Sequence, residues 1–378
     1  MTEIVRQITK ETFNLQRFQQ LRIMAITVIT LIAFSVQPAE ARALPGSFAD
    51  LADKVTNAVV NISTTQFPES DPTQQQKQPG QGGPQFEFGP GTPEPFQDFF
   101  EEFFGGPRGF PGGPRGPMPM PERNSLGSGF VIDADKGLII TNNHVIQAAD
   151  EIKVTFQDDT AIDATVLGRD PKTDLALLKV DPDAYDMTDV KWGSSTDMRV
   201  GDWVLAVGNP FGLGGTVTAG IISARQRDIQ AGPYDDFLQT DASINRGNSG
   251  GPMFNTEGEV IGINTAIFSP SGGSVGIGFA VPSDLARPII EQLIEYGKTR
   301  RGWLGVRIQH VTEDIAESLN LEQSRGALVA SVTPNGPAEK AGLKAGDIIL
   351  EFNNQEISEM RRLPRIVAET AIGSEPNV

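Results

Sequence analysis

The chain has 378 residues, enough for two folded domains with connecting segments. Its formal net charge of −17, with no basic stripe to offset it, argues against nucleic acid as a partner. The lack of cysteine excludes disulfides, thiolate catalysis and cysteine-based metal sites. His144 and His310 are the only histidines, too few for most histidine-rich metal sites, and we expect neither a metal nor another cofactor.

Residues 1–43 have the pattern of a secretory signal peptide. Arg22 directly precedes an uncharged apolar run, residues 23–36, which is short for a helix that spans a bilayer. Small residues follow, with candidate cleavage points after Ala41 and Ala43. We therefore expect a secreted protein with no stable membrane span after cleavage. An uncleaved membrane anchor is the alternative.

Residues 66–122 are rich in Pro, Gly and Gln, and we expect them to form a flexible loop because they cannot bury enough apolar surface to fold alone. One island in this segment carries five phenylalanines at the spacing of a single helical face: Phe96, Phe99, Phe100, Phe103 and Phe104. Such a stripe must dock on another surface. Its partner is either the chain's own core or a neighbouring subunit or active site.

From Leu126 onward, short apolar segments alternate with turn residues, which indicates antiparallel barrels or a sandwich. A helix follows, with Ser283 as its N-cap, a kink at Pro288 and an end at Gly297. We expect the first domain to span residues 44–298.

Gly247, Ser249 and Gly251 match the G-x-S-x-G pattern of an α/β-hydrolase nucleophile elbow. That fold needs a helix directly after the serine and the chain order serine, acid, histidine. Here Pro252 and a predicted strand follow, and the one later histidine, His310, falls in a different domain. The sequence therefore argues against an elbow.

The order of chymotrypsin-like proteases fits instead, because His144, Asp174 and Ser249 follow one another as histidine, aspartate and serine. Asp170 and Asp181 are rivals for the aspartate. We favour Asp174 because it begins a buried strand, where an orienting carboxylate would be shielded from water.

The segments "TNNHV", "DLALLKV", "QTDASINRGNSGGP", "GWLGV" and "NGPAEKAGLKAGDIILEFN" closely resemble the HtrA (DegP-like) family of periplasmic serine endoproteases. The resemblance covers essentially the whole chain after the signal. It implies a mainly β fold, with two six-stranded antiparallel β-barrels of chymotrypsin type and a small α+β PDZ domain. It also implies a periplasmic location, a homotrimer or larger cage, and unfolded or misfolded polypeptides as substrates.

The same resemblance implies roles for individual residues. His144 would be the general base, Ser249 the nucleophile and Asp174 the group that orients His144. The backbone N–H groups of Gly247 and Ser249 would form the oxyanion hole. The strand that contains Ile263, Asn264 and Thr265 would offer its edge to the substrate backbone.

Two positions depart from the digestive enzymes of this type. Asn248 stands where those enzymes carry an aspartate that pairs with a newly cut amino terminus, so we expect control by the ordering of loops rather than by propeptide cleavage. Ser243 and Ile244 offer no carboxylate at the specificity position. We therefore predict cleavage after small aliphatic residues, with Asn248 also lining the substrate site.

Residues 302–378 resemble a bacterial PDZ domain that lacks its last strands, and hence an incomplete one. Its expected peptide-binding residues, which would capture the C-termini of polypeptides, are Gly302, Trp303, Leu304, Gly305, Val306 and Ile308. The chain as a whole is predicted to be a serine endopeptidase of periplasmic protein quality control. The alternative is a chaperone that holds misfolded chains and cleaves them only secondarily.

Overall fold

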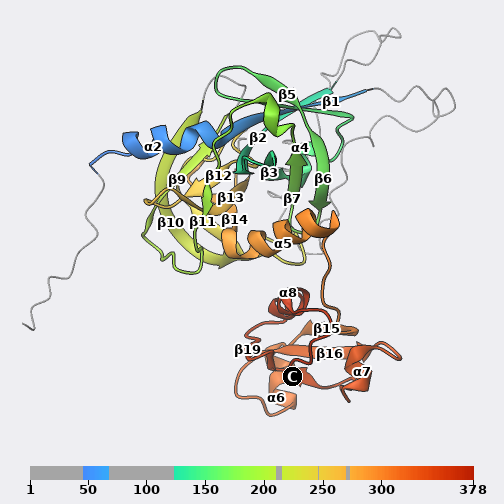
Figure 1. Cartoon of the computed structure of the whole chain (residues 1–378). Coiled ribbons are helices and arrows are strands. Elements are labelled where there is room, and N and C mark those ends of the chain that lie inside the picture. Colours follow the sequence, from blue (N-terminus) through green and yellow to red (C-terminus); the bar gives the residue numbers. More distant parts are fainter. Residues whose placement is uncertain (1–45, 68–122, 210–214, 246, 270–272) are drawn as a thin grey trace, which may run out of the picture. The chain divides into compact units, whose positions relative to one another are not determined.

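The computed structural model describes residues 46–67, 123–209, 215–245, 247–269 and 273–378 (Figure 1). Contacts divide the chain into two units, Met1–Phe48 and Ala49–Val378. The expected signal peptide and the phenylalanine stripe lie outside the described residues. Within the second unit the fold is mainly β, as the sequence predicts.

The first sheet has seven antiparallel strands in the order β5-β4-β1-β2-β3-β7-β6 (Figure 1). β5 and β6 are separated by Ala164 alone, so one bent segment pairs with β4 at its start and with β7 at its end. The strands are β1 (Val59–Gln66), β2 (Arg123–Asp133), β3 (Leu138–Asn142), β4 (Glu151–Thr155), β5 (Ala161–Asp163), β6 (Thr165–Asp170) and β7 (Leu175–Lys179). Two short helices, α2 (Ala49–Val55) and η1 (Thr56–Ala58), precede them.

Strand β7 is buried on both faces because its sequence, LALLK, is apolar on both faces, and its first four residues are buried. β1 pairs along its full length with β2, with Gln66 opposite Arg123. Gln66 therefore belongs to a strand rather than to the expected loop, and the segment between these two residues joins the ends of a hairpin.

The second sheet closes into a six-stranded barrel, because β12 pairs with β9 on one side and with β13 on the other. A short seventh strand, β8, adds to β13 in parallel. The strands are β8 (Lys191–Trp192), β9 (Trp203–Gly208), β10 (Thr216–Arg227), β11 (Phe237–Thr240), β12 (Pro252–Phe254), β13 (Glu259–Ile267) and β14 (Gly278–Pro282). A 3-10 turn, η2 (Pro182–Ala184), lies on the chain between the two sheets.

Helix α5 (Ser283–Tyr296) follows the barrel, with Pro288 inside it. It ends as predicted at Gly297, which adopts the left-handed conformation at φ 67°. The predicted N-cap is wrong, because Pro282 holds that position and Ser283 is already helical. The Ser283 hydroxyl instead accepts the N–H of Ser195 at 3.0 Å and donates to the carbonyl of Gly193 at 2.8 Å. It thus ties the helix start to the loop after β8.

The C-terminal part contains a three-stranded antiparallel sheet in the order β15-β16-β17 and a two-stranded hairpin. Its core is apolar and includes Val329, Phe352 and Ile366. The elements are β15 (Val306–His310), α6 (Glu313–Ser318), β16 (Ala327–Val332), α7 (Pro337–Lys340), β17 (Ile348–Ile349), β18 (Glu351–Phe352), β19 (Gln355–Glu356) and α8 (Arg362–Glu369).

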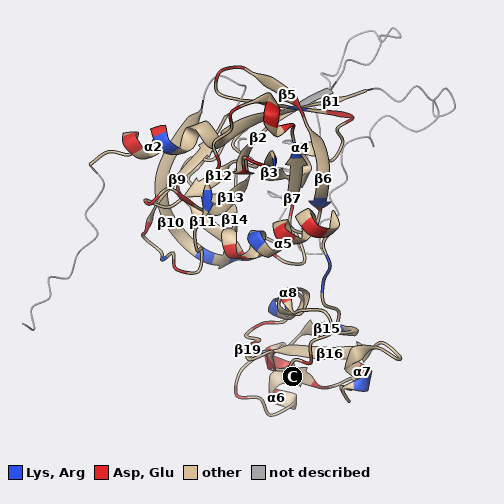
Figure 2. Cartoon of the chain, in the orientation of Figure 1, with Lys and Arg blue, Asp and Glu red and all other residues tan. Residues whose placement is uncertain are grey.

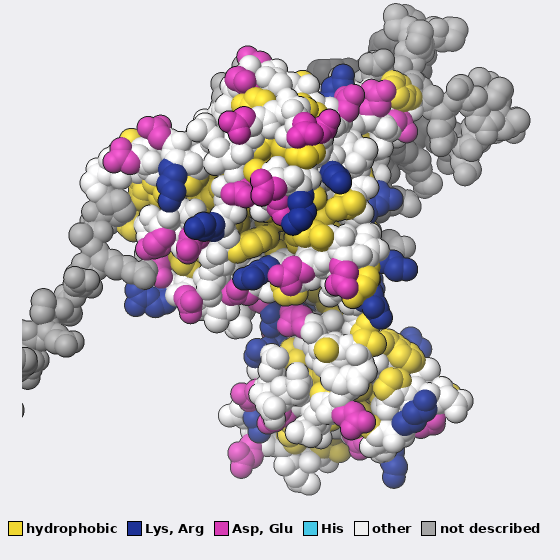
Figure 3. Space-filling model, viewed as in Figure 1, with side chains coloured by type: hydrophobic (Ala, Val, Ile, Leu, Met, Phe, Trp, Pro, Cys, Tyr) yellow, Lys and Arg dark blue, Asp and Glu magenta, His cyan; other side chains and the backbone are white. Residues whose placement is uncertain are grey.

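Acidic residues are spread over the loops and helices of both sheet regions (Figure 2). On the face seen in Figure 3, acidic and basic side chains alternate and apolar areas lie between them. Within the described residues, no helix is long and apolar enough to cross a bilayer.

Candidate active site

His144 lies in the short helix α4 (Asn143–Ile146), which begins directly after β3, and it is 6% exposed. Its Nδ1 lies 2.5 Å from Oδ2 of Asp174, and its backbone N–H donates to Oδ1 of the same carboxylate at 2.8 Å. The carboxylate therefore fixes both the ring and the backbone of His144. In this arrangement Asp174 favours the tautomer that carries its proton on Nδ1.

Asp174 precedes β7 and has a left-handed backbone, with φ 56°. Its carbonyl accepts the backbone N–H of Asn143 at 3.1 Å and the side-chain amide of Asn142 at 2.8 Å. No sequence pattern predicts this conformation, since aspartate is only one of several residues that tolerate it.

The two rival aspartates have other partners. Asp170 is buried and forms an ion pair with Arg301, and it also accepts the hydroxyl of Thr173 at 2.5 Å. Asp181 is exposed and accepts the N–H of Asp183 at the start of η2. Within the part of the chain that the structure describes, Asp174 is the only one of the three aspartates that contacts His144.

Ser249 lies in the loop before β12 and is 5% exposed. The glycines on either side, Gly247 and Gly250, have φ values of 99° and 86°, which a residue with a side chain rarely adopts. The Ser249 carbonyl accepts the N–H of Ser128 at 2.8 Å, and the Ser128 hydroxyl donates to the carbonyl of Gly247. Ser128 in β2 thus fixes both ends of the tight turn.

This turn packs against the end of β3, which directly precedes the helix of His144. A Cβ added to Gly250 would overlap the carbonyl of Ser128 and the hydroxyl of Thr141. A Cβ on Gly127 would meet both Val145, the residue after His144, and the carbonyl of Ser249. The fold therefore brings the segments of His144 and Ser249 together, although 105 positions separate them in the printed sequence.

The N–H groups of Gly247 and Ser249 have no backbone or side-chain acceptor among the hydrogen bonds of the described residues. The neighbouring N–H groups are used, because Asn248 donates to Asn245 and Gly250 donates to Asn264. Two uncommitted amide groups on either side of Asn248 are what an oxyanion hole requires.

The Asn248 side chain is buried under the loop rather than exposed to solvent. Its Nδ2 lies 3.5 Å from the carbonyl of Ser243, and its Oδ1 occupies the space above Gly208. Thr218 also donates to the Ser243 carbonyl, at 2.9 Å. Asn248 therefore contributes to the shape of the loop in front of Ser249.

Ile244 is buried and its side chain fills the space beside Gly278, where a Cβ would come within 2.7 Å of Ile244 Cγ1. Ser243 beside it is exposed. The backbone of Asn264 is paired on both edges, with Gly250 and Gly251 on one side and with β14 on the other. From Thr265 onward, no described strand pairs with the edge of β13 that faces away from β14.

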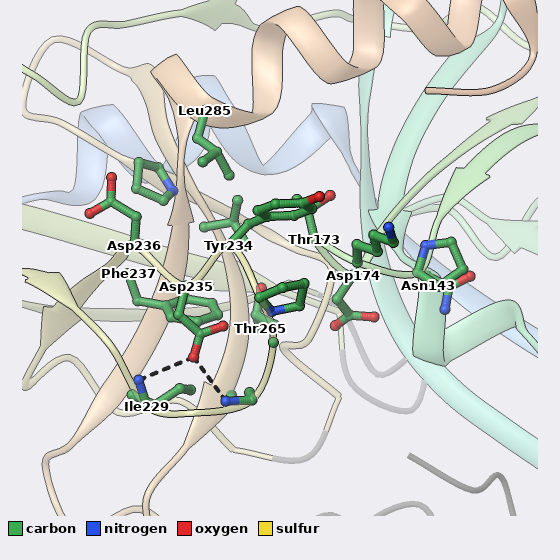
Figure 4. A pocket seen from close by; sticks show the side chains of 18 of the residues that line it. Asn143, Thr173, Asp174, Ile229, Tyr234, Asp235, Asp236, Phe237, Thr265 and Leu285 are labelled. Atoms are coloured by element: carbon green, nitrogen blue, oxygen red, sulfur yellow. Dashed lines mark hydrogen bonds between the residues drawn. The ribbon is translucent and has the colours of Figure 1, made fainter. Parts of the chain in front are cut away.

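A cavity of about 570 Å³ lies beside Asp174, and Ser249 does not line it (Figure 4). Its walls include Asn143, Thr265, Tyr234, Asp235 and Leu285. The Asp235 carboxylate accepts the backbone N–H groups of Ala231 at 2.8 Å and Ile229 at 3.2 Å, which orders this part of the wall.

Burial raises the pKa of Asp235 to about 7, against the lowering effect of the Ala231 N–H, and the nearby carboxylate of Asp228 raises it further. Sequence reasoning missed this residue. The stretch that contains it, "GPYDDF", has the composition of an ordinary solvated turn.

The predicted peptide-binding loop of the C-terminal part has a left-handed glycine, Gly305, at φ 80°. The carbonyl of Leu304 accepts the N–H of Ala338 at 2.9 Å, and the carbonyl of Gly305 accepts the N–H of Thr333 at 2.8 Å. These two backbone hydrogen bonds hold the loop in place. Trp303 is 63% exposed. β15, with Val306 and Ile308, pairs with β16 on one edge, and no described strand covers the other.

A profile of the trypsin-like peptidase domain matches residues 127–263, and a profile of the PDZ domain matches residues 292–371. A probable periplasmic serine endoprotease DegP-like from Marinomonas sp. (strain MWYL1) is 47% identical over 349 residues, which are 92% of this chain and 71% of the relative. The chain belongs to the HtrA (DegP-like) family.

Other members of this family are equally similar. The DegP-like protein of Brucella suis biovar 1 (strain 1330) is 50% identical over 340 residues, 87% of this chain but only 64% of the relative. The chain therefore spans less than two thirds of the length of that relative. A solved structure of the HtrA-type protease AlgW with decapeptide matches with a TM-score of 0.65 at 40% identity, covering 87% of this chain and 92% of that one.

Proposed function

We propose that this protein is a serine endopeptidase of the periplasm that degrades unfolded or misfolded polypeptides. The observation that carries the proposal is the 2.5 Å contact between His144 Nδ1 and Asp174, next to a serine held on a glycine turn. The relatives are named periplasmic serine endoproteases, which supports the reaction and the compartment. The proposed export signal is the segment of residues 1–43.

In the proposed mechanism, His144 takes the proton from the Ser249 hydroxyl as its oxygen attacks the substrate carbonyl. The negative charge that develops on the carbonyl oxygen is bound by the N–H groups of Gly247 and Ser249. His144 then gives its proton to the leaving amine, and the acyl group remains on Ser249. A water molecule, deprotonated by His144, hydrolyses this ester and restores the free serine. Asp174 stabilises the imidazolium in both halves.

We infer that cleavage follows small aliphatic residues such as valine or alanine. The buried Ile244 and the uncharged Ser243 support this specificity, because neither could neutralise a lysine or arginine side chain. Asn248 would line the same pocket, and the substrate backbone would pair with β13 from Thr265 onward.

The proposed domains are a protease domain, residues 44–298, and a PDZ domain, residues 302–378. We propose that the latter captures polypeptide C-termini on the Gly302–Gly305 loop and on the open edge of β15. Assembly into homotrimers or larger cages, and regulation through ordering of residues 66–122, belong to the same proposal. Deletion of residues 66–122 should change basal activity or its stimulation by peptides, and unchanged values would contradict this regulation.

Degradation of unfolded casein by the wild type and by Ser249→Ala tests the reaction. We expect Ser249→Ala to leave casein intact, and continued degradation would overturn the assignment of Ser249. The same variant also tests the chaperone alternative. Suppression of aggregation by the cleavage-deficient variant would mean that holding and cleaving coexist in one chain.

A further inference from the structure

Asn142 is the last residue of β3, lies at the N-cap of α4 and is 0% exposed. Asparagine at an N-cap normally accepts a backbone N–H of the first helical turn through its side chain. Asn142 makes no such bond. The N–H of His144 in that turn is instead bonded by the Asp174 carboxylate at 2.8 Å. The usual capping partner has thus been replaced by a residue from another segment, and the Asn142 side chain serves a different contact.

The two amide hydrogens of Asn142 are both used. Nδ2 donates to the carbonyl of Asp174 at 2.8 Å and to the hydroxyl of Thr265 at 3.2 Å. Its Oδ1 receives no hydrogen bond from the described part of the chain. The hydrogen bonds that the side chain of Asn142 makes to described residues are therefore all donated by its Nδ2 group.

The first of these bonds holds a backbone that would otherwise relax. Asp174 has a left-handed conformation, which residues other than glycine rarely adopt unless their surroundings hold them. Rotation about its φ angle would move the carbonyl and swing the carboxylate away from His144. Within the described part of the chain, the Asn142 amide and the backbone N–H of Asn143 hold the Asp174 carbonyl.

The second bond reaches the other sheet. Thr265 belongs to β13 of the closed barrel, and its hydroxyl donates in turn to the carbonyl of Ile263 at 2.9 Å. Asn142 therefore joins the end of a strand in the first sheet to a strand in the second. Asp174 is held at this junction.

We propose that Asn142 is a positioning residue that keeps Asp174 in its left-handed conformation and thereby aligns the carboxylate with His144. The inference rests on the proposed function, because alignment matters only if His144 is the base. Asn142 itself does not contact the reacting atoms. It acts through Asp174, and its loss slows the chemical step without weakening substrate binding.

The test compares Asn142→Leu, which keeps the size of the side chain and removes its donors, with the wild type. A matched control is Asn255→Leu, since Asn255 is also buried but bonds only within the turn of residues 255–259. We expect Asn142→Leu to lower kcat by about ten- to a hundredfold. This is a smaller effect than the loss of about 10⁴-fold that follows replacement of a triad aspartate. KM should change by much less than kcat, because Asn142 bonds the hydroxyl of Thr265 and not the backbone on which the substrate is proposed to pair.

A second readout follows the histidine rings directly. The chain has two histidines, so the ring signals in NMR of protein labelled with ¹⁵N-histidine come from two residues only, and His310 is an internal reference. Asn142→Leu should move or broaden the Nδ1–H signal of His144 and leave that of His310 unchanged. Asn255→Leu should lower thermal stability and alter neither the ring signals nor kcat.

Identical kcat values and His144 signals in the two variants would overturn the inference. Asn142→Ser, with one hydroxyl hydrogen in place of two amide hydrogens, is the milder variant if Asn142→Leu does not fold. It should show the same changes to a smaller extent, and wild-type values would again contradict the role. Asp174→Asn separates the triad from the positioning role. If Asp174→Asn leaves kcat and the His144 signal unchanged, the proposed triad is wrong. If Asp174→Asn lowers kcat while Asn142→Leu keeps the wild-type kcat and His144 signal, only the positioning role of Asn142 is wrong.

Discussion

Asp174 contacts His144 at two points, with Oδ1 accepting the backbone N–H at 2.8 Å and Oδ2 lying 2.5 Å from Nδ1. One carboxylate therefore orders the segment that carries the ring and also the ring itself. Such a double contact restricts both the rotation of the side chain and its tautomer, which is what a general base in acyl transfer needs.

Replacement of Asp174 by asparagine should lower kcat by about 10⁴-fold, because the amide cannot hold the required tautomer. The measurement is the steady-state rate on a fluorogenic peptide with a valine before the scissile bond. Asp181→Asn is the control, since Asp181 is exposed and its carboxylate accepts the N–H of Asp183 rather than a group of His144. Activity of Asp174→Asn above about a tenth of the wild type would contradict the role given to Asp174.

The glycine turn around Ser249 should tolerate no side chain at Gly250. Gly250 and Gly201 both have left-handed backbones, at φ 86° and 99°, but a Cβ on Gly201 meets nothing within 4 Å. Gly201→Ala should therefore lower the free energy of unfolding by about 1–2 kcal/mol from backbone strain alone. Gly250→Ala should cost more, because its Cβ would overlap Ser128, and should abolish activity. Urea unfolding and peptide hydrolysis measure both, and equal effects would contradict the packing described for the turn.

The ion pair between Asp170 and Arg301 should matter for stability. Arg301→Ala leaves a buried carboxylate without its cation, and such a loss costs about 3–5 kcal/mol. Arg199→Ala is the control, because Arg199 is largely exposed in its pair with Asp202 and should contribute less than about 1 kcal/mol. Denaturant unfolding at constant pH compares the two. Similar small losses would mean that the Asp170 pair is not buried in solution.

Stability should fall as the pH rises toward neutrality, in part because of Asp235. Its pKa is about 7 in the folded chain, against 3.8 for an aspartate free in water, so between these values the folded state binds more protons than the unfolded state. The favourable contribution is complete below pH 3.8 and is lost as the pH passes through 7.

Asp235→Asn should remove this dependence while keeping an oxygen that accepts the N–H groups of Ala231 and Ile229. The variant should gain about 2–4 kcal/mol relative to the wild type between about pH 4 and pH 8. Thermal or urea unfolding across that interval measures the difference. A constant difference between the two proteins would show that Asp235 does not titrate there.

The candidate triad could be predicted because residue counts and the order of residues along the chain are enough to select its members. Because the chain has two histidines, there is little choice of general base. The chain order and the buried strand that follows Asp174 select the aspartate. The mainly β fold could be predicted for the same reason, since strand periodicity is a local property. The placement of the barrel strands and the pairing of Gln66 with Arg123 are long-range properties that no local pattern encodes.

The contributions of Asn142 and Ser283 could not be predicted, because local propensity suggested the wrong partner for each. Both residues are favoured at helix N-caps, and sequence reasoning assigned Ser283 that role. In the structure their side chains bond to distant segments instead, Asn142 to Asp174 and Ser283 to the loop at Gly193. Tertiary hydrogen bonds at buried positions outweigh a local cap when the cap can be supplied by another group.

The most direct test of the proposed reaction is covalent labelling with a serine-directed phosphonate, followed by mass mapping of the modified residue. We expect one modified residue, Ser249, with labelling lost in Ser249→Ala and strongly slowed in His144→Ala. Labelling at another serine, or undiminished labelling of Ser249→Ala, would contradict the claim that Ser249 is the nucleophile of a peptidase.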